Sequence, residues 1–210
     1  MTAPLHGPLE WRRIVQWLRE DGVIAVEEAQ RTVARLAQAE SSQHPLVRLA
    51  SVAMARASDD KPLDIEALTE YLATRVGLDY LRIDPLRVDV GKVAETMSAT
   101  YAERHKVLPV QVTPNEVVIA TSEPFITDWV AEVERQARRT VRRVLVNPLD
   151  LQRYTVEFFA LAKSVRNAQK TSGSLSASSF EQLVELGKSS KQLDANDQGV
   201  VKVVDWLWQY

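Results

Sequence analysis

Residues 107–125, VLPVQVTPNEVVIATSEPF, carry the clearest structural pattern in this chain. They hold two short runs rich in β-branched residues, separated by Pro114 and Asn115. Proline presets φ at a turn and asparagine tolerates left-handed backbone, so the stretch predicts a β-hairpin. Pro124 is then expected to end the second strand, because proline cannot donate a hydrogen bond inside a sheet.

The residues that follow predict a helix, a third strand and a second helix. The first helix is indicated by apolar residues at helical spacing, which are Ile126, Trp129, Val130, Val133 and Ala137. VRRVLVN, residues 141–147, predicts a strand, and PLDLQRYTVEFFALA, residues 148–162, predicts a helix. Residues 78–165 are therefore expected to form a ββαβα subdomain, a small three-stranded sheet with packed helices.

The residues before this subdomain have helical periodicity. Two apolar stripes flank Gly22, which suits the left-handed cap that ends a helix, and a third helix is expected to begin near Pro45. Asp64 is placed to cap a fourth helix, which Gly77 should terminate. Residues 9–77 are thus expected to form a helical N-terminal subdomain, and the fold class is α+β.

Two further segments connect or follow these subdomains. Residues 78–88 are expected to be an extended connector, and residues 90–104 one or two short helices. Residues 166–196 include the serine-rich TSGSLSASS and predict a flexible linker, because such a segment buries too little apolar surface to offset its ordering entropy. Residues 197–210, DQGVVKVVDWLWQY, have an apolar face without a partner and predict the truncated start of a further domain.

Composition excludes several classes of function. The chain has 210 residues, 45% of them hydrophobic, and its net charge of −2 comes from 26 basic and 28 acidic residues that are mostly interspersed. Such a chain offers no overall attraction to nucleic acid. It contains no cysteine, hence no disulfide and no thiolate metal site. No apolar run approaches the roughly 20 residues that span a bilayer, so a soluble, cytoplasmic protein without direct membrane insertion is expected.

No catalytic or metal-binding motif is complete. Gly187, Lys188 and Ser189 resemble the end of a phosphate-binding loop, but Gln182 stands where that loop needs its first glycine. The three histidines are far apart in sequence, so they do not indicate a metal site. The chain is therefore expected to be no enzyme, with no catalytic residue, cofactor or metal.

Two basic clusters are candidate binding surfaces. The first lies where a predicted helix turns into a strand and could contact an acidic partner; it consists of Arg135, Arg138, Arg139, Arg142 and Arg143. Its alternative explanation is a solvated helix end whose cations complement the helix dipole. The second, Arg12, Arg13 and Arg19 on the first helix, has the alternative explanation of a polar face beside a core stripe.

Four stretches resemble the N-terminal region of type II secretion and type IV pilus assembly ATPases, the general secretion pathway protein E family. They are LTEYLATRVGLDY (residues 68–80), YAERHKVLPV (101–110), VVIATSEP (117–124) and DQGVVKVVDWLW (197–208). Glu123 stands in the third stretch where the family usually has aspartate. The resemblance depends on the order and spacing of the four stretches together.

The resemblance implies a cytoplasmic motor that hydrolyses ATP in domains after Tyr210. This chain would be its non-catalytic docking and regulatory domain, coupling the motor to the cytoplasmic domain of an inner-membrane platform protein. Its other partners would be the ATPase's own C-terminal domains, in a hexamer. The chain would thus be peripheral to the inner membrane through a partner.

Some members of this family bind cyclic di-GMP through paired motifs that begin Arg-Leu-Gly. Alignment on the glycine of the first motif makes Arg13, Leu18 and Gly22 the candidate ligand-binding residues. The glycine that should follow Arg13-Ile14 is Val15, however, and Met54 replaces a glycine of the second motif. Side chains there would lie where the backbone must approach the ligand. Docking is therefore the leading hypothesis, and cyclic di-GMP sensing is the alternative.

Overall fold

The computed structural model describes residues 6–38 and 40–174. The chain divides into two compact units, residues 1–163 and 164–210, and apart from the end of α8 the features below belong to the first. Most of the predicted linker and the predicted start of a further domain lie outside the described residues. Within the described ranges, no helix combines the length and the apolar character needed to cross a membrane.

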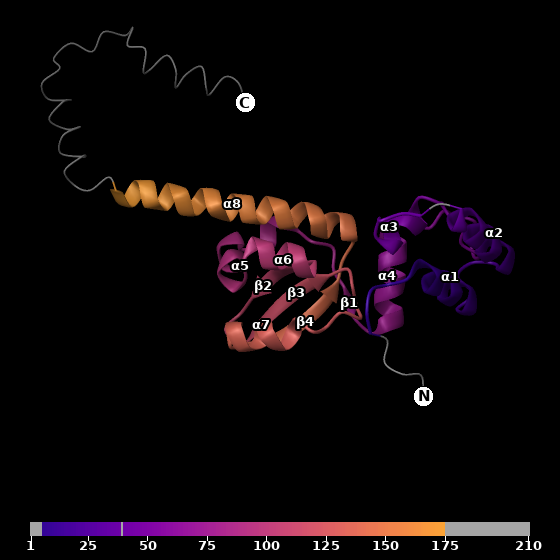
Figure 1. The fold of residues 1–210 in the computed structure, drawn as a ribbon, viewed down its shortest axis with the longest axis horizontal. Helices are drawn as coiled ribbons and strands as arrows, with labels where there is room; N and C mark the ends of the chain where they lie inside the picture. Colours follow the sequence, from indigo (N-terminus) through magenta and orange to yellow (C-terminus); the bar gives the residue numbers. More distant parts are fainter. Residues whose placement is uncertain (1–5, 39, 175–210) are drawn as a thin grey trace, which may run out of the picture. The chain divides into compact units, whose positions relative to one another are not determined.

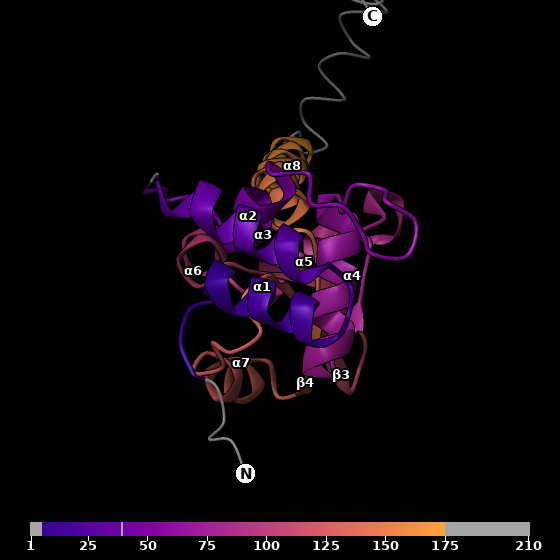
Figure 2. The ribbon, with the colours of Figure 1, turned by 90° about the vertical axis from the view of Figure 1, so that its right-hand side faces the viewer.

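Four helices form the N-terminal part, and the predicted helix boundaries are confirmed (Figure 2). Gly22 and Gly77 have φ of +68° and +72° and follow the first and fourth helices. Pro45 opens the third helix, and the Asp64 side chain accepts a hydrogen bond of 2.8 Å from the Ala67 amide at the start of the fourth. The helices are α1 (Trp11–Glu20), α2 (Val26–Ala37), α3 (Pro45–Ala50) and α4 (Ile65–Val76).

The sheet has four strands where the sequence predicted three. The predicted strands are present as β2 (Val107–Val112), β3 (Glu116–Thr121) and β4 (Thr140–Leu145). The fourth strand, β1 (Asp79–Tyr80), belongs to the segment expected to be an extended connector, and it pairs in parallel with β4. Two residues are too few to show the alternation that predicts a strand, so no local pattern indicated β1.

The order of the strands is β1-β4-β3-β2. β2 and β3 form the predicted antiparallel hairpin, and β3 pairs in parallel with β4. The pairing of β2 with β3 shifts between Pro109 and Gln111, which places a bulge in the edge strand β2. Between β1 and β2 lie the 3₁₀ turn η1 (Pro85–Arg87) and two short helices, α5 (Val90–Thr96) and α6 (Ala99–His105).

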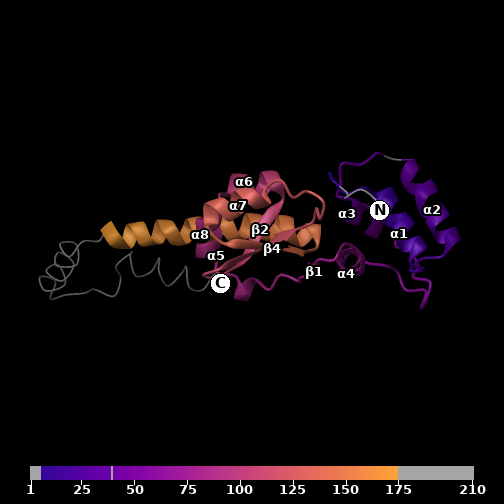
Figure 3. The same ribbon diagram turned by 90° about the horizontal axis from the view of Figure 1, so that it is seen from below.

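Helices cover both faces of the sheet, because β3 is apolar on both sides. Val117 and Ile119 share a core with Trp129 and Val133, which belong to the region of α7 (Val130–Ala137). The alternating residues of β3 point to the opposite face and share a core with α8 (Pro148–Ser174); these are Val118 and Ala120, packed with Leu151, Tyr154 and Phe158. Figures 1 and 3 show the start of α8 along one face of the sheet and α7 on the other.

The helix α8 continues to Ser174, although the sequence predicted a linker from residue 166. Residues 166–170, RNAQK, include several good helix formers, and a helix already nucleated on a packed segment adds residues at little cost. The serine-rich segment begins only at residue 171. The described part of α8 therefore extends well past Ala162, the last residue of the helix that is buried.

Candidate functional site

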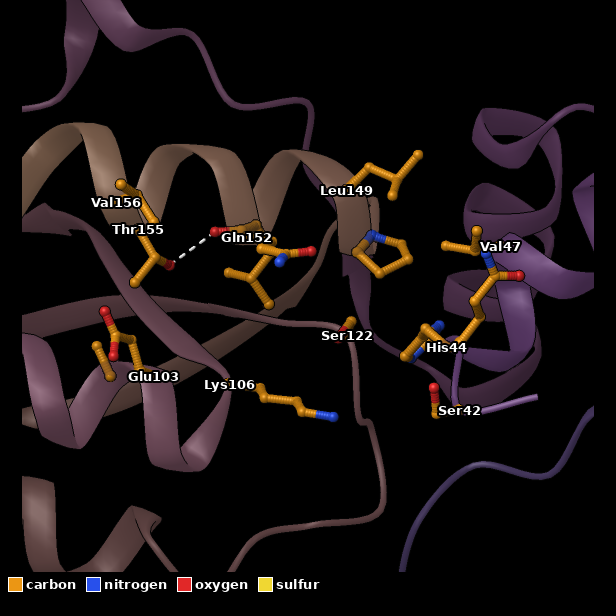
Figure 4. Close-up of a pocket in the computed structure, with 14 residues that line it drawn as sticks. Ser42, His44, Val47, Glu103, Lys106, Ser122, Leu149, Gln152, Thr155 and Val156 are labelled. Carbon is orange, nitrogen blue, oxygen red and sulfur yellow. Dashed lines mark hydrogen bonds between the residues drawn. The ribbon is translucent and has the colours of Figure 1, made fainter.

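A pocket of about 590 Å³ lies where four segments meet: residues 42–47, the end of α6, the end of β3 and the first turns of α8 (Figure 4). The start of α8 contributes Leu149, which is 49% exposed, and Val156, which is 60% exposed. The other lining groups are mostly polar and include Ser42, Lys106 and Ser122. The pocket therefore has an apolar wall opposite a set of polar groups.

Lys106 lines this pocket from the end of α6. Its φ is +52°, a left-handed conformation that is uncommon for lysine, and its amide donates to the Ala102 carbonyl to close the helix. Figure 4 shows the side chain extended so that its ammonium end points toward Ser42 and away from Glu103. Among the described residues, no carboxylate lies within ion-pair distance of this ammonium. Lys106 is exposed and thus presents to the pocket an ammonium group with no carboxylate partner among the described residues.

Ser122 lines the same pocket and directly follows β3. Only 2% of its surface is exposed, yet no hydrogen bond joins its hydroxyl to another described residue. The preceding Thr121 side chain, by contrast, accepts a hydrogen bond of 3.0 Å from the Glu123 amide. Buried hydroxyls normally have a hydrogen-bond partner, so the Ser122 hydroxyl is an unused polar group facing the cavity.

Glu123 fastens the N-terminal part to the end of β3, beside this pocket. Its carboxylate accepts a hydrogen bond of 2.8 Å from the Leu9 amide and is buried. The Leu46 amide donates to His44 Nδ1 at 3.2 Å, which places the proton of a neutral imidazole on Nε2. That nitrogen is buried 3.5 Å from the Glu123 carboxylate, close enough for an ion pair if histidine is protonated but outside hydrogen-bond geometry. The glutamate that departs from the family pattern therefore has a structural function.

A second connection runs through Glu66 at the start of α4. The Tyr80 hydroxyl donates to one carboxylate oxygen, and the Asn147 amide donates to the other at 2.7 Å. Asn147 in turn accepts from the Leu149 amide at 2.9 Å and so caps α8. Burial, together with the hydrogen bond to Glu66, raises the pKa of the Tyr80 hydroxyl well above its usual value. This network fixes the start of α8 against α4.

The predicted ligand-binding residues do not converge on one cavity. The Leu18 side chain is fully buried in the N-terminal core, and Gly22 serves as the helix stop after α1. Arg13 is half-buried on α1. A groove of about 450 Å³ does lie between α1 and α2, but its lining from α1 comprises Arg12, Val15, Gln16 and Arg19.

The five predicted partner-binding arginines lie on different surfaces. Arg142 and Arg143 are successive residues of β4, so their side chains point to opposite faces of the sheet. Arg142 forms ion pairs with Asp79 at 3.2 Å and Glu116 at 3.3 Å, while Arg143 donates to the Pro124 carbonyl at 2.8 Å. The structure therefore does not gather the five side chains on one surface.

Two members of the cluster remain available for a partner. Arg139 donates to the Pro114 carbonyl at 3.3 Å, but Arg135 and Arg138 are exposed at the end of α7. Neither of these two forms an ion pair with another residue of the described ranges. Within those ranges, there is also no group of three or more acidic or histidine side chains that could hold a metal ion.

Comparison with known proteins identifies the class to which these features correspond. Residues 76–165 match the family model of the MshEN domain. Over 170 residues the chain is 38% identical to the type IV pilus assembly ATPase TfpB of Acinetobacter baylyi. This match covers 80% of this chain and 29% of that protein. The resemblance to pilus assembly ATPases is thereby confirmed over most of this chain. The chain spans less than a third of the length of this curated relative.

One solved structure shows a similar fold. The structure of MshE with cdg superposes with a TM-score of 0.51 at 17% identity and covers 70% of this chain and 98% of that one. The N-terminal domain of XpsE gives a TM-score of 0.42 at 16% identity, covering 68% and 91%. The mixed architecture of helices and a small sheet is thus shared with MshE, as the predicted fold class requires.

Proposed function

We propose that this chain is the non-catalytic docking and regulatory domain of a pilus-assembly or secretion ATPase. It couples the motor to the cytoplasmic domain of an inner-membrane platform protein and is held at the membrane periphery by that partner. The observation that carries the proposal is the 38% identity over 170 residues to a pilus assembly ATPase of which this region covers only 29%. The phosphate-binding loop of the motor would lie in the remainder, because Gln182 leaves the fragment here incomplete.

The exposed end of α7 is the surface best suited to an acidic partner. Arg135 and Arg138 carry two unpaired guanidinium groups there, three residues apart. Arg138 also caps the helix with φ of +53°, so its backbone position is fixed. Exposed cations of this kind mainly accelerate association and set orientation, since their contribution is screened by salt.

Removal of these two cations should weaken platform binding. In the double variant Arg135→Gln/Arg138→Gln, we expect the affinity for the cytoplasmic domain of the cognate platform protein to fall about three- to tenfold at low salt, and less at high salt. Biolayer interferometry with the platform domain encoded beside this protein measures it. Arg87→Gln is the matched control, because Arg87 is exposed but already paired with Asp84.

The docking proposal itself is tested by the wild-type chain in the same assay. Binding to the platform domain supports it. A chain with the circular dichroism of a folded domain that binds none of the neighbouring platform domains would overturn it. Binding that is unchanged in the double variant would leave docking in place and move it to another surface.

Cyclic di-GMP sensing is the second candidate, because the MshEN domain is a cyclic di-GMP-binding domain. The groove between α1 and α2 has a size suited to a small ligand, and Arg12 and Arg19 could contact its phosphates. Val15 lines this groove, and its side chain keeps a ligand farther from the backbone than a glycine would. Calorimetric titration should give heat that Arg19→Gln reduces, and a wild-type titration without heat or thermal shift would dispose of this candidate.

A further inference from the structure

We propose that the pocket between residues 42–47 and the start of α8 binds an oxyanion, a carboxylate or phosphate group, carried on a small molecule with an apolar body. This site is separate from the α1–α2 groove, with which it shares no lining residue. It is also distinct from Arg135 and Arg138, neither of which lines it.

The polar side of the pocket is rich in hydrogen-bond donors. Lys106 contributes an ammonium group with no carboxylate partner among the described residues, and Ser42 and Ser122 contribute hydroxyls. Figure 4 shows these three side chains on the same side of the pocket, with the lysine extended toward Ser42. A carboxylate or phosphate oxygen accepts hydrogen bonds and carries the charge that an ammonium attracts. The donor set therefore favours an anion over a cation.

The strongest single observation is the state of Ser122. Ser122 is 2% exposed and its hydroxyl has no hydrogen-bond partner among the described residues, but the hydroxyl oxygen is not fully buried and so is open to the pocket. A ligand oxygen in the pocket would supply the missing partner. Lys106 differs from Ser122 in being exposed, and it contributes an ammonium group that lines the same pocket without a carboxylate partner among the described residues.

The apolar wall of the pocket indicates that the rest of the ligand is apolar. Leu149 and Val156 are largely exposed on α8 and line the pocket together with Val47. An apolar group laid on this wall would be removed from water, which favours binding in proportion to the area covered. Glu103 is the one carboxylate among the lining residues; it is exposed, and Lys106 points away from it.

The test is a titration of the ¹⁵N-labelled full chain followed by amide chemical shifts. The probes are sodium hexanoate, inorganic phosphate and neutral hexanol, each at constant ionic strength. We expect hexanoate or phosphate to shift the amides around Ser122, Lys106 and Leu149 with an apparent dissociation constant of about 1–10 mM. Tighter binding of hexanoate assigns the site to a carboxylate on an apolar body, and tighter binding of phosphate assigns it to a phosphate group.

Variants distinguish an effect on anion binding from an effect on folding. Lys106→Gln and Ser122→Ala should each weaken the anion about fivefold or more, because each removes a donor. Arg104→Gln is the control, since it removes a neighbouring charge of α6 that does not line the pocket. Ser122→Ala should leave the thermal midpoint of the unliganded chain unchanged or higher, whereas a serine with a purely structural role would lower it.

Three results would overturn the proposal. One is the absence of shifts with both anions up to about 50 mM, well above the expected dissociation constant. Another is binding of hexanol as tight as that of hexanoate, which would make the pocket simply apolar. The third is an anion affinity that Arg104→Gln reduces as much as Lys106→Gln does.

Discussion

Replacing Glu123 with alanine should lower the free energy of unfolding by about 2–3 kcal/mol, because a buried amide loses its charged hydrogen-bond partner. The Leu9 amide would lose its 2.8 Å hydrogen bond, and His44 Nε2, which has no hydrogen-bond partner, would lose the only carboxylate near it in the part of the chain that the structure describes. The Leu9 amide is too buried to recover a hydrogen bond from water at no cost. The loss should loosen the attachment of the N-terminal segment to β3 before the sheet itself unfolds.

Urea denaturation monitored by circular dichroism measures this effect, and two variants act as controls. Glu123→Gln keeps an acceptor oxygen for the Leu9 amide and should cost less, about 1 kcal/mol. Glu103→Ala removes an exposed carboxylate nearby and should change stability by less than about 0.5 kcal/mol. If Glu123→Ala proves no more destabilising than Glu103→Ala, the buried hydrogen bond between Glu123 and the Leu9 amide does not contribute to the free energy of unfolding.

Trp129→Ala should lower the free energy of unfolding still more, by about 3–5 kcal/mol. The Trp129 side chain is 1% exposed and shares a core with Val117 and Ile119 of the central strand and Val133 of α7. Its indole nitrogen donates a hydrogen bond of 2.9 Å to the Ile126 carbonyl. Alanine would therefore leave a large cavity beneath α7 and an unpaired carbonyl in the turn before it.

Thermal unfolding compares this variant with two others. Trp129→Phe keeps most of the apolar volume and should lose about 1–2 kcal/mol, mainly from the hydrogen bond and the smaller ring. Trp17→Ala removes a half-buried indole that meets the Phe125 ring at 6.2 Å, and it should cost less than Trp129→Ala. An equal loss at the two tryptophans would contradict the assignment of Trp129 to the core of the sheet.

Local sequence signals predicted most of the architecture. The hairpin around Pro114 and Asn115, the Asp64 cap and the stops at Gly22 and Gly77 each follow from the backbone preference of one or two residues. The strand β1 could not be predicted in this way, because it exists only through its pairing with β4. Its formation depends on contacts between residues far apart in the sequence, which a local pattern does not contain.

The candidate site could not be predicted from the sequence either, because it too depends on contacts between residues far apart in the sequence. Ser122 is buried because residues 42–47 and the start of α8 close over the end of β3. The left-handed backbone of Lys106 could not be predicted, because glycine or asparagine usually adopts this conformation and lysine does not. The arginines did leave a usable signal: Arg142 and Arg143 are adjacent on a predicted strand, so strand alternation alone already places them on opposite faces.

The bulge in β2 restricts the ways in which a partner can attach. β2 is an edge of the sheet, and Pro109, which has no amide hydrogen, stands where the pairing with β3 shifts. A peptide that added itself as a fifth strand would need a regular row of amide and carbonyl groups along that edge. β1, the other edge, offers only two residues. We therefore expect protein partners to recognise this domain by its side chains and helix surfaces, and the isolated domain to resist the edge-to-edge stacking that leads to aggregation.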